Sequence, residues 1–380
     1  MIRILYHHRT ASRDGQRVHI DEMVSAWRQA GHEVIMGEPG SGRTGAMGRD
    51  SKVIGWLKAH APGALYELAE LAYSVPAYWK LRAAIKKHQP HFLYERYQSF
   101  MLAGRWCKKR TGIPFLSEVN APLTEEREKH GSLRLRSLAK WCDKQIWTAA
   151  DHVLPVTEVL ATYIRAAGVD NDAITVIPNG ANMTLLDAAP TAQRAKEKRG
   201  LEGKTVLGFT GFVRDWHGLD RVLPLLKDRP DTALLIVGDG PARQDLEAQA
   251  ANLGVKDQLQ FTGFVEREEI PEYVAAFDVA LQPDVVPYAS PLKLFDYLGL
   301  AKPVVAPDTA NIREVLDHGE NAILFDAADP QAFARATGEL LDDAKAQEAL
   351  GRAALKTIEA GQYLWTANAA RVISLAEKTA

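Results

Sequence analysis

The stretch Tyr288-Ala-Ser-Pro-Leu-Lys-Leu-Phe-Asp-Tyr-Leu-Gly-Leu-Ala-Lys-Pro-Val-Val-Ala-Pro307 combines a polar loop, a helical pattern and a short apolar strand. Ser290 is a favourable N-cap residue and Pro291 suits the first helical position, so a helix is expected to begin there. The first-turn N–H groups of such a helix lack intrahelical partners and carry the positive end of the helix dipole. The stretch therefore predicts an anion site at Ser290, Pro291, Leu292 and Lys293.

Two charged side chains are expected on one side of this helix. Lys293 lies in the first turn and adds a formal positive charge to the anion site. Asp296 follows three residues later, a spacing that places both residues on the same side. An ammonium for phosphate beside a carboxylate for hydroxyl groups suits a sugar nucleotide. The alternative is a capped amphipathic helix without a ligand.

At these residues the chain resembles the retaining glycosyltransferases of family 4, which have two Rossmann-like domains in the GT-B architecture. The family carries Glu-x7-Glu at this place, followed by a Gly/Ala-Lys-Pro-Val-Val strand. Asp296 stands at the second acidic position, and Ala301-Lys-Pro-Val-Val305 matches the strand. Tyr288 replaces the first acidic residue. A branch of the family reads Ser-Pro-x-Lys-Leu-Phe-Glu-Tyr, which residues 290–297 follow closely.

The composition indicates a two-domain globular protein with unlike halves. A chain of 380 residues is long for one core and suitable for two. Residues 1–180 hold 25 basic and 18 acidic side chains, whereas residues 181–380 hold 21 and 30. A basic first half and an acidic second half indicate different partners for each.

Other sequence features exclude several classes of protein. Cys107 and Cys142 have no metal-ligand spacing and indicate reduced thiols in a reducing compartment. The N-terminal apolar run is too short for a signal peptide, and no run approaches the ~18 apolar residues of a membrane span. We expect a cytoplasmic protein, or one held peripherally on the inner membrane face. Neither a metal nor another cofactor is expected, and no pattern indicates nucleic-acid binding.

The first half alternates strands and helices. Apolar segments at 3–6, 32–36, 92–97 and 114–120 are expected to form parallel strands, whose carboxyl ends reach a ligand site. Glu95 and Arg96 end the third of these segments and are expected on the acceptor side. His19, at the start of the first helix, either joins them or packs in the core.

Two further site residues of the first half rest on the resemblance. In family 4 the loop after the first strand faces the cleft and usually carries Gly-Gly; Gly15 retains half of that pair and is expected near a donor phosphate. Many members place a histidine close to the reacting carbon, near the end of the 114–120 strand. Asn120 stands there instead, either to offer its amide to the sugar or to cap the strand end.

The second half contains the expected donor site. The corner Pro178-Asn-Gly180 matches the family's domain junction, although turn chemistry alone explains it. We expect an acceptor domain at 1–182 with a crossover helix at about 363–380, and a nucleotide-sugar domain at 183–362.

The strand at 205–210 begins the second domain and leads to the expected diphosphate site at Gly211. The family usually has Gly-Arg after this strand and Lys-Gly at the end of the loop. This chain has Phe212 and His217 there, so we expect Arg214 and Lys293 to bind the diphosphate jointly. By the same resemblance, the backbone at Val265 would pair with the nucleobase.

The segment 51–88 shows two helical patterns that mix tryptophan with basic residues: Trp56, Lys58, Trp79, Lys80, Arg82, Lys86 and Lys87. Such helices suit an anionic membrane surface. The alternative is a solvated helix face with its tryptophans in the core.

Together these features predict a retaining, metal-independent glycosyltransferase with Asn120, Lys293 and Asp296 as its catalytic residues. It would move a sugar from a UDP- or GDP-sugar to a glycan, lipid-linked or small-molecule acceptor in polysaccharide, glycolipid or glycoconjugate biosynthesis. Two alternatives remain: a nucleotide-sugar epimerase of the same fold, and a non-catalytic glycosyltransferase-like subunit.

Overall fold

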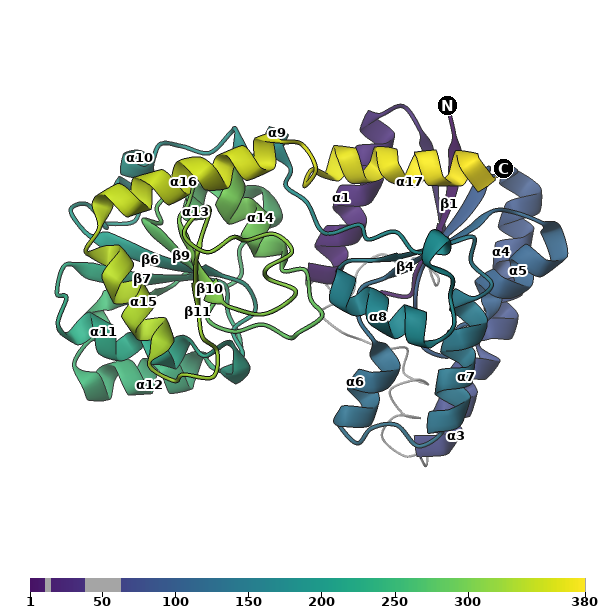
Figure 1. Cartoon of the computed structure of the whole chain (residues 1–380), viewed down its shortest axis with the longest axis horizontal. Coiled ribbons are helices and arrows are strands. Elements are labelled where there is room, and N and C mark those ends of the chain that lie inside the picture. The colour runs from purple at the N-terminus through teal and green to yellow at the C-terminus, as the bar shows by residue number, and fades with distance from the viewer. Residues whose placement is uncertain (11–14, 38–62, 380) are drawn as a thin grey trace. The chain divides into compact units, whose positions relative to one another are not determined.

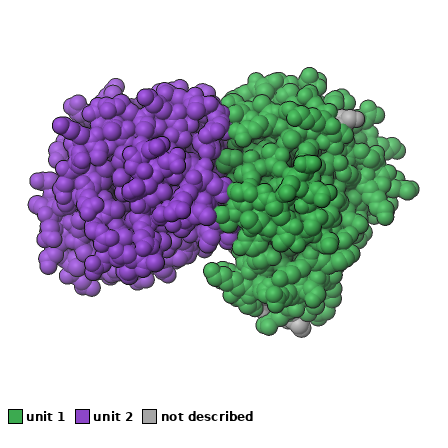
Figure 2. Space-filling view, in the orientation of Figure 1, with its two compact units in different colours: residues 1–178, 366–380 green, residues 179–365 purple. Residues whose placement is uncertain are grey.

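The computed structural model describes residues 1–10, 15–37 and 63–379. The chain divides into two compact units, coloured separately in Figure 2: unit 1 is Met1–Pro178 with Thr366–Ala380, and unit 2 is Asn179–Trp365. The first part of the predicted helical segment, residues 51–62 with Trp56 and Lys58, lies outside the described residues.

Unit 1 is built on a parallel sheet with the strand order β2-β1-β3-β4-β5. The strands are β1 (Arg3–His7), β2 (Glu33–Gly37), β3 (Phe92–Arg96), β4 (Phe115–Val119) and β5 (His152–Pro155). The helices are α1 (Gly15–Gln29), α3 (Gly63–Ala72), α4 (Ser74–His88), α5 (Ala103–Thr111), α6 (Leu123–Lys129), α7 (Arg136–Trp147), α8 (Glu158–Ala166) and α17 (Trp365–Thr379), with the 3-10 turn η1 (Asn171–Ala173).

The order of these strands creates a switch point between β1 and β3. From β1 the chain passes to β2 on one side and then returns to β3 on the other. Open parallel sheets bind ligands outside the carboxyl ends of the strands at such a point. The last helix, α17, joins this unit and runs beside α1 (Figure 1). The Trp27 indole N–H on α1 donates to the carbonyl of Ala369 on α17 at 3.2 Å.

Unit 2 is built on a second parallel sheet with the order β11-β10-β9-β6-β7-β8, which is the Rossmann order with its switch point between β6 and β9. The strands are β6 (Thr205–Thr210), β7 (Thr232–Val237), β8 (Leu259–Phe261), β9 (Val279–Leu281), β10 (Val304–Pro307) and β11 (Ile323–Phe325). The α-helices are α9 (Met183–Leu186), α10 (Ala192–Glu197), α11 (Leu223–Lys227), α12 (Arg243–Leu253), α13 (Ile270–Val274), α14 (Leu292–Gly299), α15 (Ala332–Leu341) and α16 (Ala344–Glu359). The 3-10 turns are η2 (Asp215–His217), η3 (Leu219–Val222), η4 (Lys256–Gln258) and η5 (Arg267–Glu269).

The central strands are apolar because helices cover both faces of a parallel sheet. Every residue of β3, β4 and β7 is buried. Gly208 in β6 is required by close packing, since a Cβ there would lie 2.1 Å from the ring of Phe277. The predicted fold class, α/β with two Rossmann-like units, is confirmed.

Candidate functional site

The end of β6 and the start of α14 meet at the switch point of the unit 2 sheet. The hydroxyl of Tyr297 on α14 accepts a hydrogen bond from the Thr210 N–H at 2.8 Å. Tyr297 is fully buried, and burial raises its pKa, so its hydroxyl is neutral. This bond attaches the helix to the carboxyl end of the first strand of unit 2.

The start of α14 differs from the sequence prediction. Pro291 is the N-cap residue of the helix, and no side chain caps it. The Ser290 hydroxyl instead accepts a hydrogen bond from the Asn179 N–H at 3.1 Å, and the Asn179 amide donates to the Ser290 carbonyl at 2.5 Å. The prediction of Ser290 as N-cap and Pro291 as first helical residue was wrong, because the Ser290 hydroxyl bonds to Asn179 of the domain-junction corner and not to the helix.

Lys293 lies in the first turn of α14 with its ammonium above an aromatic ring. Its Nζ is 3.8 Å from the ring centroid of Phe209 in β6. A Cβ built on Gly211 would lie 3.3 Å from this Nζ. In the described parts of both units no carboxylate pairs with Lys293, and burial lowers its pKa to about 7. An ammonium without a counterion favours the arrival of an anion.

His217 and Arg214 lie in the loop after β6 but differ in charge. The Arg214 N–H donates to His217 Nδ1 at 3.1 Å, which places the neutral imidazole's proton on Nε2. Burial, followed by the charges of Lys293 and Arg214, lowers the pKa of His217 to about 3. Arg214 is exposed, with its guanidinium carbon 5.1 Å from the ring centroid of Phe212. Beside the carboxyl end of β6 the positive charge therefore comes from Lys293 and Arg214, and their predicted role in binding a diphosphate remains a prediction.

Asp296 lies one turn along α14 and is buried. Its two carboxylate oxygens accept hydrogen bonds from the Arg267 guanidinium at 2.6 and 2.8 Å. Arg267 follows the half-buried Val265 by two residues, so this bidentate pair links the Val265 segment to α14. The sequence analysis missed Arg267; the available signal was a basic residue close to Val265. The predicted roles of Asp296 and Val265 remain predictions.

Unit 1 gathers three predicted site residues around one carboxylate, that of Glu118 in β4. Glu118 Oε2 is 3.2 Å from the Tyr6 hydroxyl and 3.1 Å from His19 Nε2. Its Oε1 accepts hydrogen bonds from the side chains of Arg96 and Asn120. We call these five side chains the Glu118 network.

The Glu118 network is buried and charged. Glu118 is 2% exposed, and burial alone would favour its neutral acid. The charges of His19 and Arg96 outweigh burial and hold the pKa of Glu118 well below its usual range. The sequence analysis missed Glu118 as the common partner, although an acidic residue inside the apolar strand 115–119 was a usable signal.

The other predicted residues of unit 1 lie outside this network. Glu95 Oε2 lies at hydrogen-bond distance from His7 Nδ1, 2.6 Å away. Gly15 is exposed and belongs to α1, so the prediction that it lies in the loop after the first strand was wrong.

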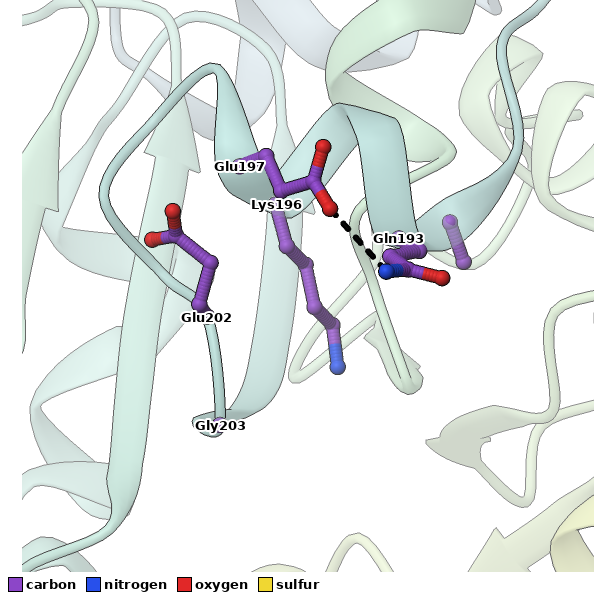
Figure 3. Close-up of a pocket in the computed structure, with 6 residues that line it drawn as sticks. Gln193, Lys196, Glu197, Glu202 and Gly203 are labelled. Carbon is purple, nitrogen blue, oxygen red and sulfur yellow. Dashed lines mark hydrogen bonds between the residues drawn. The ribbon is translucent and has the colours of Figure 1, made fainter.

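A shallow hollow of 320 Å³ lies elsewhere on unit 2 (Figure 3). It is lined by Ala192, Gln193, Lys196, Glu197, Glu202 and Gly203. Glu202 and Gly203 precede β6, so the hollow lies near the amino end of that strand, whereas the candidate site follows its carboxyl end. We assign no function to it.

Comparison with known proteins gives one family model for each half of the chain. Residues 14–180 match the Glycosyl transferase 4-like domain, and residues 191–357 match Glycosyl transferases group 1. The chain is 32% identical over 201 residues to 2-deoxystreptamine glucosyltransferase of Streptomyces kanamyceticus, covering 49% of this chain and 50% of the relative. It is 29% identical over 253 residues to the GDP-mannose-dependent alpha-(1-6)-phosphatidylinositol monomannoside mannosyltransferase of Mycolicibacterium smegmatis, covering 63% and 65%. The matches thus span between half and two thirds of these curated relatives.

The chain also resembles solved structures along its whole length. Anabaena Alr3699/HepE in complex with UDP and glucose superposes with a TM-score of 0.75 at 18% identity, covering 100% of both chains. The GT-B fold predicted from the sequence is thereby confirmed.

Proposed function

Since the chain belongs to the glycosyltransferases of family 4, we propose that it moves a sugar from a nucleotide-diphosphate sugar to an acceptor with retention of configuration. The observation that carries this proposal is the ammonium of Lys293 at the start of α14, which pairs with no carboxylate among residues 1–10, 15–37 and 63–379. As the bond from the sugar to the diphosphate breaks, negative charge develops on the leaving group. Preorganised positive groups that meet such charge are usually the largest contribution to catalysis.

The donor site is proposed to use four groups of unit 2. Lys293 and Arg214 bind the diphosphate, and the neutral His217 donates a hydrogen bond to it through Nε2. Asp296, whose plane is held by Arg267, accepts hydrogen bonds from donor hydroxyls; each carboxylate oxygen keeps a second lone pair for this. The backbones of Gly211 and Val265 approach the diphosphate and the nucleobase respectively.

The acceptor is proposed to bind unit 1 and to be rich in hydroxyl groups. The names of the relatives indicate an aminocyclitol acceptor for one and a phosphatidylinositol mannoside for another. Both classes present ring hydroxyls. The reaction therefore fits glycolipid or glycoconjugate biosynthesis, with UDP- or GDP-sugars as donors.

Donor identity can be tested by thermal shift. UDP-glucose and GDP-mannose are compared with glucose and mannose alone, because a ligand at 100 times its Kd adds about 2.7 kcal/mol to the free energy of unfolding. The donor that binds is then incubated with 2-deoxystreptamine or phosphatidylinositol monomannoside, and the anomeric configuration of the product is read by NMR. A folded protein that binds neither donor contradicts the proposal.

Contact with an anionic membrane is proposed for α3 and α4. Leu65 and Leu68 on α3 and Val75 and Trp79 on α4 are exposed, Trp79 by 58%, so this tryptophan is not in the core. The same helix carries Lys80, Arg82, Lys86 and Lys87. No helix of the described residues is long and apolar enough to cross a bilayer. Salt-sensitive sedimentation with anionic but not neutral vesicles is expected; equal binding to both contradicts it.

The two alternative functions, an epimerase and a non-catalytic subunit, predict different results when the same protein is incubated with the donor. An epimerase would convert UDP-glucose or GDP-mannose to an epimer without any acceptor. A non-catalytic subunit would bind the donor without turnover. Retention-specific transfer to an acceptor excludes both.

A further inference from the structure

A histidine and a glutamate occupy the switch point of the unit 1 sheet. His7 is the last residue of β1, and Glu95 pairs with it in register on β3. These two strands flank the point at which the strand order reverses, where open parallel sheets bind their ligands. No role described above uses His7.

The geometry fixes the imidazole. His7 Nδ1 lies 2.6 Å from Glu95 Oε2, and the two residues are 5% and 1% exposed. Gly104, in the first turn of α5, lets the carboxylate approach the helix: a Cβ there would lie 2.7 to 2.9 Å from the atoms of the carboxyl group. The positive end of a helix dipole favours an ionised carboxylate at this place. Glu95 is therefore an acceptor for the N–H of His7.

This hydrogen bond determines which ring nitrogen remains available. If Nδ1–H donates to Glu95, the neutral imidazole has its lone pair on Nε2. In the described part of the chain no other hydrogen bond or ion pair engages His7. The Glu118 network differs, because four side chains already contact that carboxylate.

We propose that His7 is a catalytic residue that binds an acceptor hydroxyl through Nε2 and takes its proton during transfer, with Glu95 as its positioning residue. This inference rests on the proposed function. The acceptor oxygen forms a bond to the anomeric carbon, and the bond from that carbon to the diphosphate oxygen breaks with its electron pair on the diphosphate. The hydroxyl proton moves to His7 Nε2 and then to solvent.

The test compares His7→Gln, Glu95→Gln and the double variant with the parent enzyme. Glutamine at position 7 still donates an N–H towards Glu95, so the melting temperature should change little while the base is lost. We expect kcat for transfer to fall at least about 10²-fold, the usual contribution of a general base. Donor Kd, measured by calorimetry with UDP-glucose or GDP-mannose, should stay within about twofold, since His7 is expected to act on the acceptor.

Two further measurements separate chemistry from structure. Added imidazole should restore part of the activity of a folded His7→Ala variant, and the double variant should be no slower than His7→Gln, because Glu95 acts through His7. A folded His7→Gln enzyme with parental kcat, or additive losses in the double variant, would overturn the inference alone. A parent that binds a donor but turns over neither acceptors nor water would overturn the proposed function as well.

Discussion

The charged side chains near the carboxyl ends of the two sheets differ in how they are paired. In unit 2, Lys293 lies over Phe209 without a carboxylate partner among the described residues. In unit 1, Glu118 is buried and contacts four side chains. A saturated buried network holds a scaffold together, whereas an unpaired charge at a strand end is available to a ligand. We therefore propose a structural role for the Glu118 network and a binding role for Lys293.

The largest expected effect is the loss of stability when the Glu118 network loses its carboxylate. Glu118→Gln would leave the buried Arg96 without its carboxylate partner. Removing one member of a buried ion pair costs about 3–5 kcal/mol, so chemical denaturation should show a loss of that order in the free energy of unfolding. A loss below about 1 kcal/mol would mean that the network does not stabilise unit 1. Glu158→Gln, on an exposed pair with Arg165, is the matched control and should change little.

The next largest effect tests the proposed role of Lys293 in catalysis. Lys293→Met keeps the length and helix propensity of the side chain but removes its charge. We expect kcat to fall roughly 10²–10³-fold, as when one preorganised oxyanion donor is lost. Donor binding should change less, because the contact strengthens as the leaving group gains charge. A variant with parental melting temperature and a kcat within a few-fold of the parent would rule out this role.

A smaller effect is expected one turn further along α14. Asp296→Ala should weaken donor binding by about 1.5–3 kcal/mol, the range for hydrogen bonds to charged groups. Arg267→Gln should weaken it less, since the carboxylate remains but loses its bidentate support. Calorimetry with the donor measures both variants. If Asp296→Ala binds donor as tightly as the parent, the Arg267–Asp296 pair belongs with the saturated, structural contacts instead.

Donor affinity should depend on pH through Lys293. Burial lowers the pKa of Lys293 to about 7, and a bound diphosphate should raise it by about one unit, because an opposite charge favours the ammonium. Below pH 7 the ammonium is already charged, so the affinity for the donor is at its maximum. As pH rises further, binding requires uptake of a proton, so Kd should increase by up to about tenfold in total before it levels off.

Two variants check the source of this pH dependence. Lys293→Arg should flatten the profile, because a guanidinium stays charged throughout. His217→Gln should leave its shape unchanged, since the pKa of His217 is about 3 and this residue is neutral over the whole range. A flat profile in the parent would show that Lys293 is not the group that meets the diphosphate.

The last prediction is that removal of divalent ions has no effect on transfer. Lys293, Arg214 and the start of α14 would meet the diphosphate without a divalent ion, so transfer should continue in EDTA. Loss of activity in EDTA that magnesium restores would contradict this site. The measurement is the initial rate of transfer with and without chelator at fixed donor concentration.

Much of the fold could be predicted from local patterns. Apolar runs such as 92–97 and 114–120 form β3 and β4, and Thr157, a residue type that favours the N-cap position, caps α8 by accepting from the Leu160 N–H. The motif residues Lys293 and Asp296 fall on one short helix as their spacing required. Hydrophobic period and cap chemistry act over a few residues, so a single sequence carries them.

The partners of the site residues were decided by the tertiary structure. Ser290 bonds to Asn179, 111 residues away, and not to its own helix. Glu118 is contacted by side chains from three other segments, those of Tyr6, His19 and Arg96. His7 meets Glu95 across 88 residues because β1 and β3 are neighbours in the sheet. Sequence alone determined which residues could carry charge or end a strand. Strand order and burial then determined which charges are neutralised and which, like Lys293, remain available to a ligand, because both depend on neighbours distant in the chain.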